Sequence, residues 1–529
     1  MRGLKEMLLL LSIIIVSVAG CGKASETADH DVSVESEQQG ELAGGAEQGD
    51  ELTGKSGQED ESAKEPGRKQ DELTEEQGQQ AGNNGTDEDK DTDIEKEEKE
   101  TDDEEPEGKV LNVWSSNKVF KERFDAYYPD VEKTSERGRK TVLKDGTVVN
   151  WKVISGEEEI YQKKLDKALE AQEDTDVDKR VDIFLTDGDY MKKYVESEDT
   201  LDLRGDIGLD YEDLKDHYSY TTAMGTDSKE ALKGITWQAN PGVFIYRRSI
   251  AKKIFGSDEP KAVRKQIRDW DGFEQAAELA AEQDFKLLSG YDDTYPLFFC
   301  NMDYAWVDQR TVRVDGQIQN WIRQTKDFTD KGYNNGTSLG SEEWEADFDE
   351  KSRVLGFFMV ANATNGEYNA DWEKNNNYED FALCAAPVDF YGESTYIFAA
   401  KGTDNVGLIR KICRAMTCDE EILTSITADE RFGEYTNTEA GMKALSKEGK
   451  YKEDFLGGQN PYKIYHSVAK KLFGSLITPY DDVCNKTMIS TMKSYFEGRV
   501  SLETAKKNFE SQILGKYPEE LRKVEWQSN

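Results

Sequence analysis

The 529-residue sequence contains few of the residues on which many catalytic and metal sites depend. It has three histidines, six cysteines and ten prolines. His30 lies in a highly charged segment, and neither His217 nor His466 belongs to a His-x-x-x-His pair or accompanies a nucleophile motif. The sequence therefore does not indicate zinc hydrolase or serine and cysteine hydrolase chemistry. Because acidic pairs are abundant, a glycoside hydrolase stays open as the least favoured class.

Positive charge is also scarce. Asp and Glu number 108 against 68 Lys and Arg, which gives a net charge of −40. Such a chain repels phosphate backbones and anionic membranes, so we expect no nucleic-acid partner. The five cysteines that follow position 21 are odd in number and irregularly spaced, which indicates neither a disulfide framework nor a metal cluster. We expect them to be small buried residues, and we expect no metal and no cofactor.

The chain begins with a short apolar run rather than a membrane-spanning one. The uncharged run at 7–19 is shorter than the roughly 20 residues that cross a bilayer. Arg2 and Lys5 precede it and small residues end it, as in a signal peptide. The stretch Val-Ala-Gly-Cys at 18–21 resembles the lipobox of bacterial lipoproteins. The resemblance implies that Cys21 is lipidated and holds the mature protein at the outer face of the cell membrane; an ordinary signal peptide is the alternative.

Residues 22–108 have the composition of a disordered tether. They include 31 Asp and Glu, 8 Lys and Arg and no Phe, Tyr or Trp, which gives a net charge of −23. Such a segment cannot bury enough apolar surface to offset its backbone entropy. As a flexible coil, about 87 residues span roughly 50 Å root-mean-square. We therefore expect a signal peptide at 1–20, a lipidated cysteine and acidic tether at 21–108, and a folded domain at 109–529.

Two motif matches in this tether lack the structural context that they need. The stretch at 49–56 fits the P-loop expression, but no apolar strand precedes it and no amphipathic helix follows it. The spaced carboxylates at 89–100 imitate a calcium loop, but Ile94 stands where the sharp turn needs glycine. We predict neither a nucleotide site nor a shaped calcium site here.

The segment 109–529 carries all the aromatic residues, and strand patterns alternate with helix patterns along it. Apolar runs at 110–114 and 181–185 predict strands, and Asp-Gly within 141–155 predicts a hairpin. Asp269 is a predicted N-cap for a helix that continues through Ala281. This alternation predicts an α/β fold with a mainly parallel sheet, and the length predicts two domains. Ligands of such sheets bind beyond the carboxyl ends of the strands.

Several stretches, in this order, carry a resemblance to a known family. They are Leu-Asn-Val-Trp-Ser at 111–115, Tyr-Pro-Asp at 128–130, Val-Asp-Ile-Phe at 181–184, the run from Gly-Ile-Thr-Trp to Ser-Ile-Ala-Lys at 234–252, Trp-Asp-Gly-Phe-Glu at 270–274, Phe-Tyr-Gly-Glu-Ser-Thr-Tyr at 390–396 and Asp-Phe-Leu-Gly-Gly-Gln-Asn at 454–460. Together they resemble extracellular solute-binding proteins of family 1, the receptor subunits of carbohydrate-type ABC importers. The resemblance covers nearly all of 109–529.

The resemblance implies a two-lobed clamp of the periplasmic-binding-protein kind. Each lobe is then a mainly parallel sheet flanked by helices, and strands cross between the lobes. Lobe 1 is expected at about 109–238 plus 345–390, and lobe 2 at about 239–344 plus 391–529, with C-terminal helices that can span both. Solute binds between the lobes, and the membrane subunits of an ABC importer recognise the closed form.

The implied function is that of a monomeric, membrane-anchored receptor that captures a sugar or oligosaccharide and catalyses no reaction. Use of the same clamp to sense another ligand, or for adhesion, is the alternative. Sugar sites use flat aromatic faces for the ring, and carboxylates and amides for the hydroxyls. The candidate ligand-binding residues are Trp114, Ser115, Ser116, Asp187, Asp189, Trp237, Gln238, Asp292, Asp293, Tyr295, Tyr391 and Tyr396. Core packing is an equal alternative for Trp114, and a turn is the alternative for Asp187 and Asp189.

The chain also departs from its relatives. The subgroup has Trp where Tyr295 and Tyr396 stand, and Gly-Pro-Ala-Trp where this chain has Met-Val-Ala-Asn at 359–362. Tyrosine can still stack on a sugar while it offers a hydroxyl. A smaller or more polar ligand therefore stays open.

Overall fold

The computed structural model describes residues 108–527, apart from 136–137, 156–157, 365–378, 430, 448, 450 and 475–476. The predicted signal peptide, Cys21, the acidic tether and its two motif matches lie outside the described residues. The described strands form three sheets.

The first sheet is built on β1, the apolar strand that begins the folded part. β1 pairs in parallel with β4 on one side and with β5 on the other. The expected hairpin joins β3 to β4 and turns at Gly146, whose φ of 86° suits a residue without a Cβ. The order is β2 (Val131–Thr134), β3 (Lys140–Leu143), β4 (Val148–Val153), β1 (Val110–Ser115), β5 (Ile183–Thr186), β12 (Tyr396–Ala399) and β6 (Gly234–Ile235).

The second sheet has β7 at its centre, between two antiparallel partners. All six residues of β7 are buried, as expected of a central strand covered on both faces. The third sheet combines a short hairpin with the last strand of the chain. The second sheet consists of β10 (Gly356–Val360), β7 (Gly242–Arg247) and β11 (Phe381–Cys384), and the third of β13 (Lys523–Trp526), β9 (Thr311–Val314) and β8 (Val307–Asp308).

The α/β class and the helix-flanked sheets are confirmed, but the sheets are mixed rather than mainly parallel. Parallel pairing occurs between β1 and β4, between β1 and β5, and between β13 and β9, whereas the other strand pairs are antiparallel. The reason is topological. The chain leaves the first sheet after β6 and returns with β12, which runs against β5. Alternating strand and helix patterns do not reveal such a reversal.

Strand pairing also divides the second half of the chain differently from the expected lobes. β10 and β11, from the stretch expected in lobe 1, pair with β7, which was expected in lobe 2. β12, expected in lobe 2, pairs with β5 and β6 of the first sheet. Apolar patterns predict the strands but not their partners, because pairing depends on contacts between distant segments.

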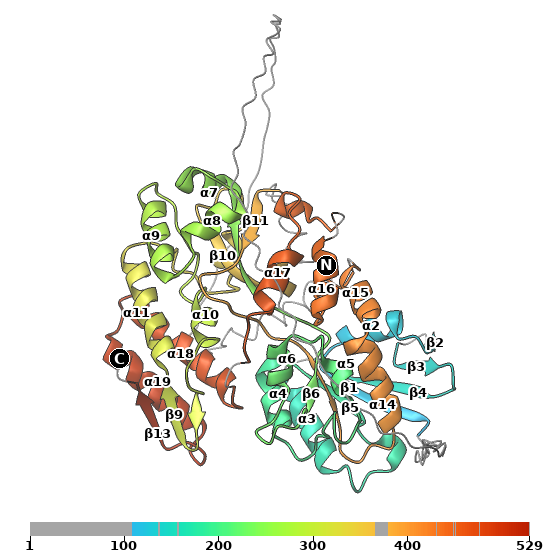
Figure 1. Cartoon of the computed structure of the whole chain (residues 1–529). Coiled ribbons are helices and arrows are strands. Elements are labelled where there is room, and N and C mark those ends of the chain that lie inside the picture. Colours follow the sequence, from blue (N-terminus) through green and yellow to red (C-terminus); the bar gives the residue numbers. More distant parts are fainter. Residues whose placement is uncertain are drawn as a thin grey trace, which may run out of the picture. The chain divides into compact units, whose positions relative to one another are not determined.

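Helices cover the sheets (Figure 1). α7, α8 and α17 pack against the second sheet, and α18 packs against α19. Asp269 caps α9 as predicted, since its side chain accepts a hydrogen bond from Gly272 N. The helices are α2 (Val119–Tyr127), α3 (Glu158–Glu170), α4 (Gly188–Val195), α5 (Tyr211–Leu214), α6 (Ser219–Met224), α7 (Arg248–Phe255), α8 (Pro260–Gln266), α9 (Trp270–Ala281), α10 (Tyr295–Phe299), α11 (Gly316–Asp330), α12 (Glu342–Ala346), α14 (Val406–Cys413), α15 (Glu420–Thr427), α16 (Glu439–Lys447), α17 (Tyr462–Ala469), α18 (Asp481–Phe496) and α19 (Leu502–Lys516).

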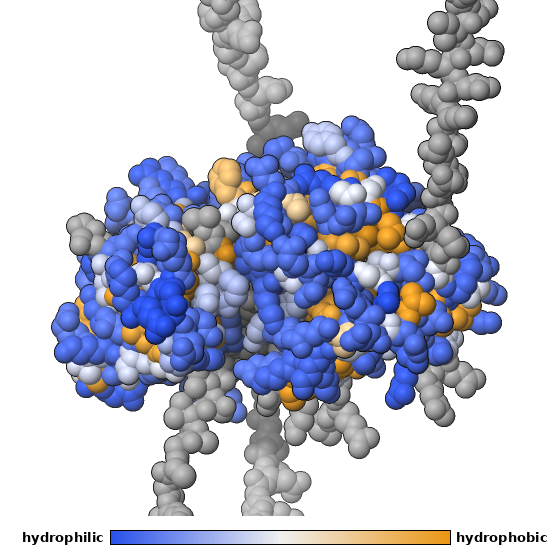
Figure 2. Space-filling model, turned by 90° about the horizontal axis from the view of Figure 1, so that it is seen from below, coloured by the Kyte–Doolittle hydropathy of each residue, from blue (hydrophilic) through white to orange (hydrophobic). Residues whose placement is uncertain are grey.

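The surface is mostly hydrophilic on the face seen in Figure 2, where apolar residues appear in separate groups. Within the described part of the chain, no helix is both long and apolar enough to span a membrane. Cys384, Cys413 and Cys484 are buried, while Cys300 and Cys418 are half-buried. The expectation of small buried cysteines therefore holds fully for three of these five.

Candidate functional site

Two segments of chain connect the first sheet to the second, and they lie side by side. The first runs from β6 to β7 and the second from β11 to β12. Pro241 forms a β-bridge with Tyr391, and Gly392 N donates a hydrogen bond to Asn240 O at 2.9 Å. The resemblance assigned both stretches to crossings between lobes, and the structure confirms that both pass between sheets.

Glu434 holds the first of these crossing segments. One carboxylate oxygen accepts from Arg123 Nε at 3.0 Å and from Trp237 Nε1 at 2.9 Å, and the other accepts from Gln238 Nε2 at 2.7 Å. The side chains of Arg123 and Glu434 are 7% and 6% exposed, so this is a buried ion pair. A charge buried at this depth is tolerated only when it is paired and hydrogen-bonded, and here both conditions are met.

A chain of hydrogen bonds continues from Glu434 to the edge of the first sheet. Gln238 Oε1 accepts from Thr395 N at 2.9 Å, which joins the two crossing segments. Thr395 Oγ1 donates to Asp187 Oδ1 at 2.5 Å. Asp187 follows β5 and precedes α4, at the carboxyl end of a parallel strand, where α/β sheets bind ligands. Burial raises the pKa of Asp187, and the Thr395 hydrogen bond partly opposes that rise.

The serines after β1 lie at the same edge. β1 and β5 are parallel, so Ser115 and Ser116 end beside the strand that leads to Asp187. Ser115 is buried, and its hydroxyl donates to Asn117 O at 2.5 Å, whereas Ser116 is half-buried. Trp114 is 6% exposed, and Lys152 Nζ lies 3.6 Å from the centroid of its ring. Trp114 is thus a core side chain covered by a lysine.

The aromatic candidates on the crossing segments are also buried. Trp237 is 2% exposed and packs 5.2 Å from the ring of Phe120. Tyr396 is 1% exposed, and its hydroxyl donates to Thr221 O at 2.9 Å. Tyr391 packs 5.3 Å from Tyr220. None of these rings offers an open face in this structure.

Asp292, Asp293 and Tyr295 lie in a different place, where the chain enters α10, and Tyr295 is the first residue of that helix. Asp293 accepts from the indole of Trp344 at 2.9 Å and from two backbone amides, and Asp292 accepts from Leu339 N at 2.8 Å. Burial raises their pKa values to about 7 for Asp292 and about 6 for Asp293. Tyr295 donates to Asn485 Oδ1 at 2.6 Å. These contacts tie the start of α10 to α12, to the loop before α12 and to α18.

The structure therefore gathers Ser115, Ser116, Asp187 and Gln238 near the ends of β1 and β5. It places Asp292, Asp293 and Tyr295 apart from them. Asp189 lies in α4, and its side chain is outside what the structure describes.

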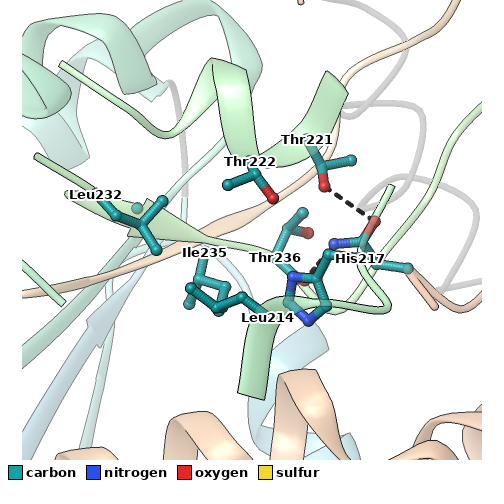
Figure 3. Close-up of a pocket in the computed structure, with 9 residues that line it drawn as sticks. Leu214, His217, Thr221, Thr222, Leu232, Ile235 and Thr236 are labelled. Carbon is teal, nitrogen blue, oxygen red and sulfur yellow. Dashed lines mark hydrogen bonds between the residues drawn. The ribbon is translucent and has the colours of Figure 1, made fainter. Parts of the chain in front are cut away.

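A small recess lies at the β6 side of the first sheet, between α6, β6 and the loop after α15 (Figure 3). It has almost no room even for a water molecule, whereas ligand pockets hold roughly 300–1,000 Å³. His217 lines it, with Nε2 2.7 Å from Thr417 O, and burial lowers the pKa of this imidazole to about 4. The recess is too small for an oligosaccharide, and the described residues hold no cluster of three or more His, Cys, Asp or Glu suited to a metal.

Sequence reasoning missed Glu434 and Thr395. Glu434 is a single acidic residue in an otherwise aromatic and polar stretch at 432–437, which is a weak signal of burial. Its three partners come from positions 123, 237 and 238, and that convergence exists only in the folded chain. Thr395 lies inside a stretch that carries the family resemblance, but only the aromatic residues of that stretch are sequence-level candidates.

Comparison with known proteins identifies the fold. No protein-family model and no curated protein matches the chain. A solved structure described as an extracellular solute-binding protein of family 1 matches with a TM-score of 0.60 and 14% identity, over 77% of this chain and 99% of its own. The binding protein associated with an ABC transporter of B. animalis subsp. lactis Bl-04, in complex with β-1,6-galactobiose, matches with a TM-score of 0.53 and 15% identity, over 79% of this chain and 100% of its own.

A third solved structure, the sugar-binding protein MalE of Xanthomonas citri, matches with a TM-score of 0.55 and 10% identity, over 77% of this chain and 98% of its own. All three are described as binding proteins. Identities this low show the fold alone. The chain has the fold of the extracellular solute-binding proteins of carbohydrate ABC transporters.

Proposed function

We propose that this protein is an extracellular receptor that captures a sugar or oligosaccharide and delivers it to an ABC importer. Lipid on Cys21 anchors it to the outer face of the cell membrane, and the acidic segment at 21–108 is its tether. Two lobes, joined by the two crossing segments, close on the solute. Closure is favoured only to the extent that the solute binds the closed form more tightly than the open one.

The observation that carries this proposal is the path of hydrogen bonds from Glu434 to Asp187. It runs through both crossing segments and ends at the carboxyl end of β5. The path links both crossing segments to Asp187, so rotation about these segments would move the groups that meet the solute. The solved relatives share this fold over nearly their whole length, and two of them are described with a sugar or as sugar-binding.

A second candidate is a smaller or more polar solute. Trp237, Tyr396 and Tyr295 are 2%, 1% and 4% exposed, so the described candidates supply no aromatic platform for a sugar ring. Polar groups, with Asp187 foremost, dominate the edge instead. An amino acid or polyamine receptor on the same clamp fits that observation.

Calorimetric titration of two variants tests the proposed site. Asp187→Asn keeps the side-chain volume but weakens acceptance of solute hydroxyls, so we expect at least a tenfold loss of affinity for whichever sugar binds. Glu198→Gln is the matched control, because Glu198 is exposed and pairs with the exposed Lys229 at 2.6 Å. Equal affinities of Asp187→Asn and Glu198→Gln for the sugar would show that Asp187 does not contribute to the binding site.

A further inference from the structure

Asp481, outside the candidate site described above, is a buried carboxylate with one oxygen unused. It lies in the first turn of α18, a 16-residue helix, and is 5% exposed. Oδ1 accepts hydrogen bonds from the backbone N–H and the hydroxyl of Thr478. Oδ2 is buried and has no hydrogen-bond partner among the described residues. A buried oxygen that lacks a donor costs free energy, so its retention calls for an explanation.

The position of Asp481 points to such an explanation. α18 belongs to the cluster of helices around the third sheet, through Cys484 and Met488, yet its residues also contact α4. α4 begins immediately after Asp187, at the edge of the first sheet. Asp481 therefore lies where a helix packed on one sheet meets a helix that begins at another.

The charged groups around Asp481 do not neutralise it directly. Lys192 on α4 lowers the pKa of Asp481, but its ammonium group is bound to Glu196 at 3.1 Å. Asp482 pairs with Lys486 at 2.5 Å. Burial is the largest effect and raises the pKa of Asp481 to about 7, with a smaller rise from Asp482. The site consequently favours a donor or a positive charge from elsewhere.

We propose that Asp481 Oδ2 accepts a hydrogen bond from a hydroxyl or ammonium group of the solute, which binds between α4 and α18. This proposal rests on the proposed receptor function and specifies the solute class as neutral or amino-bearing sugars. Parting of α4 from α18 exposes Asp481 to the entering solute, and the solute then supplies the missing donor.

The same geometry excludes acidic sugars from this position. The N-terminus of a helix attracts anions, but the first turn of α18 already holds the buried carboxylate of Asp481. Asp187 adds a second carboxylate at the start of α4. A uronic acid placed here would bring its own carboxylate against these groups, and like charges at short range in a partly dry site repel strongly.

Asp481→Asn tests the proposal, with Asp482→Asn as the matched control one residue away. The oxygen of the introduced amide would still accept hydrogen bonds from Thr478. Its N–H₂ group would stand where Oδ2 was and would face the donor group of the solute, so that hydrogen bond could not form. The full-length protein and both variants are titrated calorimetrically with cellobiose, the chitosan disaccharide and digalacturonate, and with the other disaccharides that raise the wild-type unfolding midpoint. We expect at least a tenfold loss of affinity for Asp481→Asn, none for Asp482→Asn, and no binding of digalacturonate.

Unliganded stability at pH 8 provides a second readout that needs no solute. If Oδ2 is reserved for a solute, Asp481→Asn removes a buried charge and leaves the unfolding midpoint unchanged or higher. A midpoint several degrees lower, unchanged affinity in the variant, or tight binding of digalacturonate would each overturn the proposal. If the wild type binds no sugar at all, the receptor function fails instead, and the stability readout still decides whether Asp481 is a structural cap.

Discussion

Glu434→Gln is the variant that perturbs the crossing segments most selectively. The substitution keeps the shape of the side chain but removes the buried counter-ion of Arg123, whose guanidinium then lies 3.0 Å from a neutral amide and keeps only the exposed Glu122, 3.7 Å away, among its described acidic partners. It also places an N–H₂ group against one of the donors that now meet the carboxylate, the indole of Trp237 or the amide of Gln238. Breaking a buried ion pair by removing one partner costs about 3–5 kcal/mol.

That cost converts to a measurable change in the unfolding midpoint. An unfolding entropy of about 2.1 cal/mol/K per residue, over roughly 420 residues, gives about 0.9 kcal/mol/K, so we expect the midpoint to fall by about 3–6 °C. Differential scanning calorimetry measures the fall. Glu439→Gln is the control, because its partner Lys470 is 58% exposed and such surface pairs contribute about 0–1 kcal/mol. The reasoning is refuted if both variants melt within a degree of each other.

Three further predictions follow from burial, titration and the predicted anchor. Trp237→Ala should lower the unfolding free energy by about 3–5 kcal/mol in a denaturant titration, because Trp237 is a core side chain. An unchanged midpoint would contradict the core assignment and favour a role of Trp237 in ligand binding. Burial raises the pKa of Asp292 to about 7 in the folded protein, so the folded state holds this proton more tightly than the unfolded chain does. The resulting contribution to stability is fully present below about pH 4 and is lost as the pH rises through 7. Wild type should therefore lose more stability between pH 5 and pH 8 than Asp292→Asn does, and parallel pH profiles would contradict this. Cys21→Ala should abolish incorporation of a labelled fatty acid and release the protein from the membrane fraction; labelling that persists would exclude Cys21 as the lipidated residue.

Local features of the fold were predictable from the sequence because local chemistry determines them. Asp269 caps α9, and the Asp-Gly turn joins β3 to β4, since caps and turns depend on a few adjacent residues. The direction and partners of β12 were not predictable. They depend on which sheet the chain joins after the long segment that follows β6, and the residues at 396–399 do not indicate that sheet.

In the candidate site, too, residues defined by local sequence were predictable, and residues defined by distant contacts were not. Asp187 was predictable because it follows a strand that ends at the sheet edge where α/β folds bind ligands. Trp237 and Tyr396 were misleading as exposed platforms, because an aromatic residue has the same pattern in a core as in a cleft. Glu434 and Asp481 acquire their roles only from burial and from partners distant in sequence.

Thermal unfolding of the full-length protein against a panel of oligosaccharides, amino acids and polyamines tests the receptor function most directly. A solute at 100 times its dissociation constant adds about 2.7 kcal/mol of stability, which raises the midpoint by about 3 °C for a protein of this size. We predict such a rise with at least one neutral or amino-bearing sugar. A rise with amino acids or polyamines and none with any sugar would contradict the carbohydrate assignment, and no rise with any solute would contradict a receptor function for this clamp.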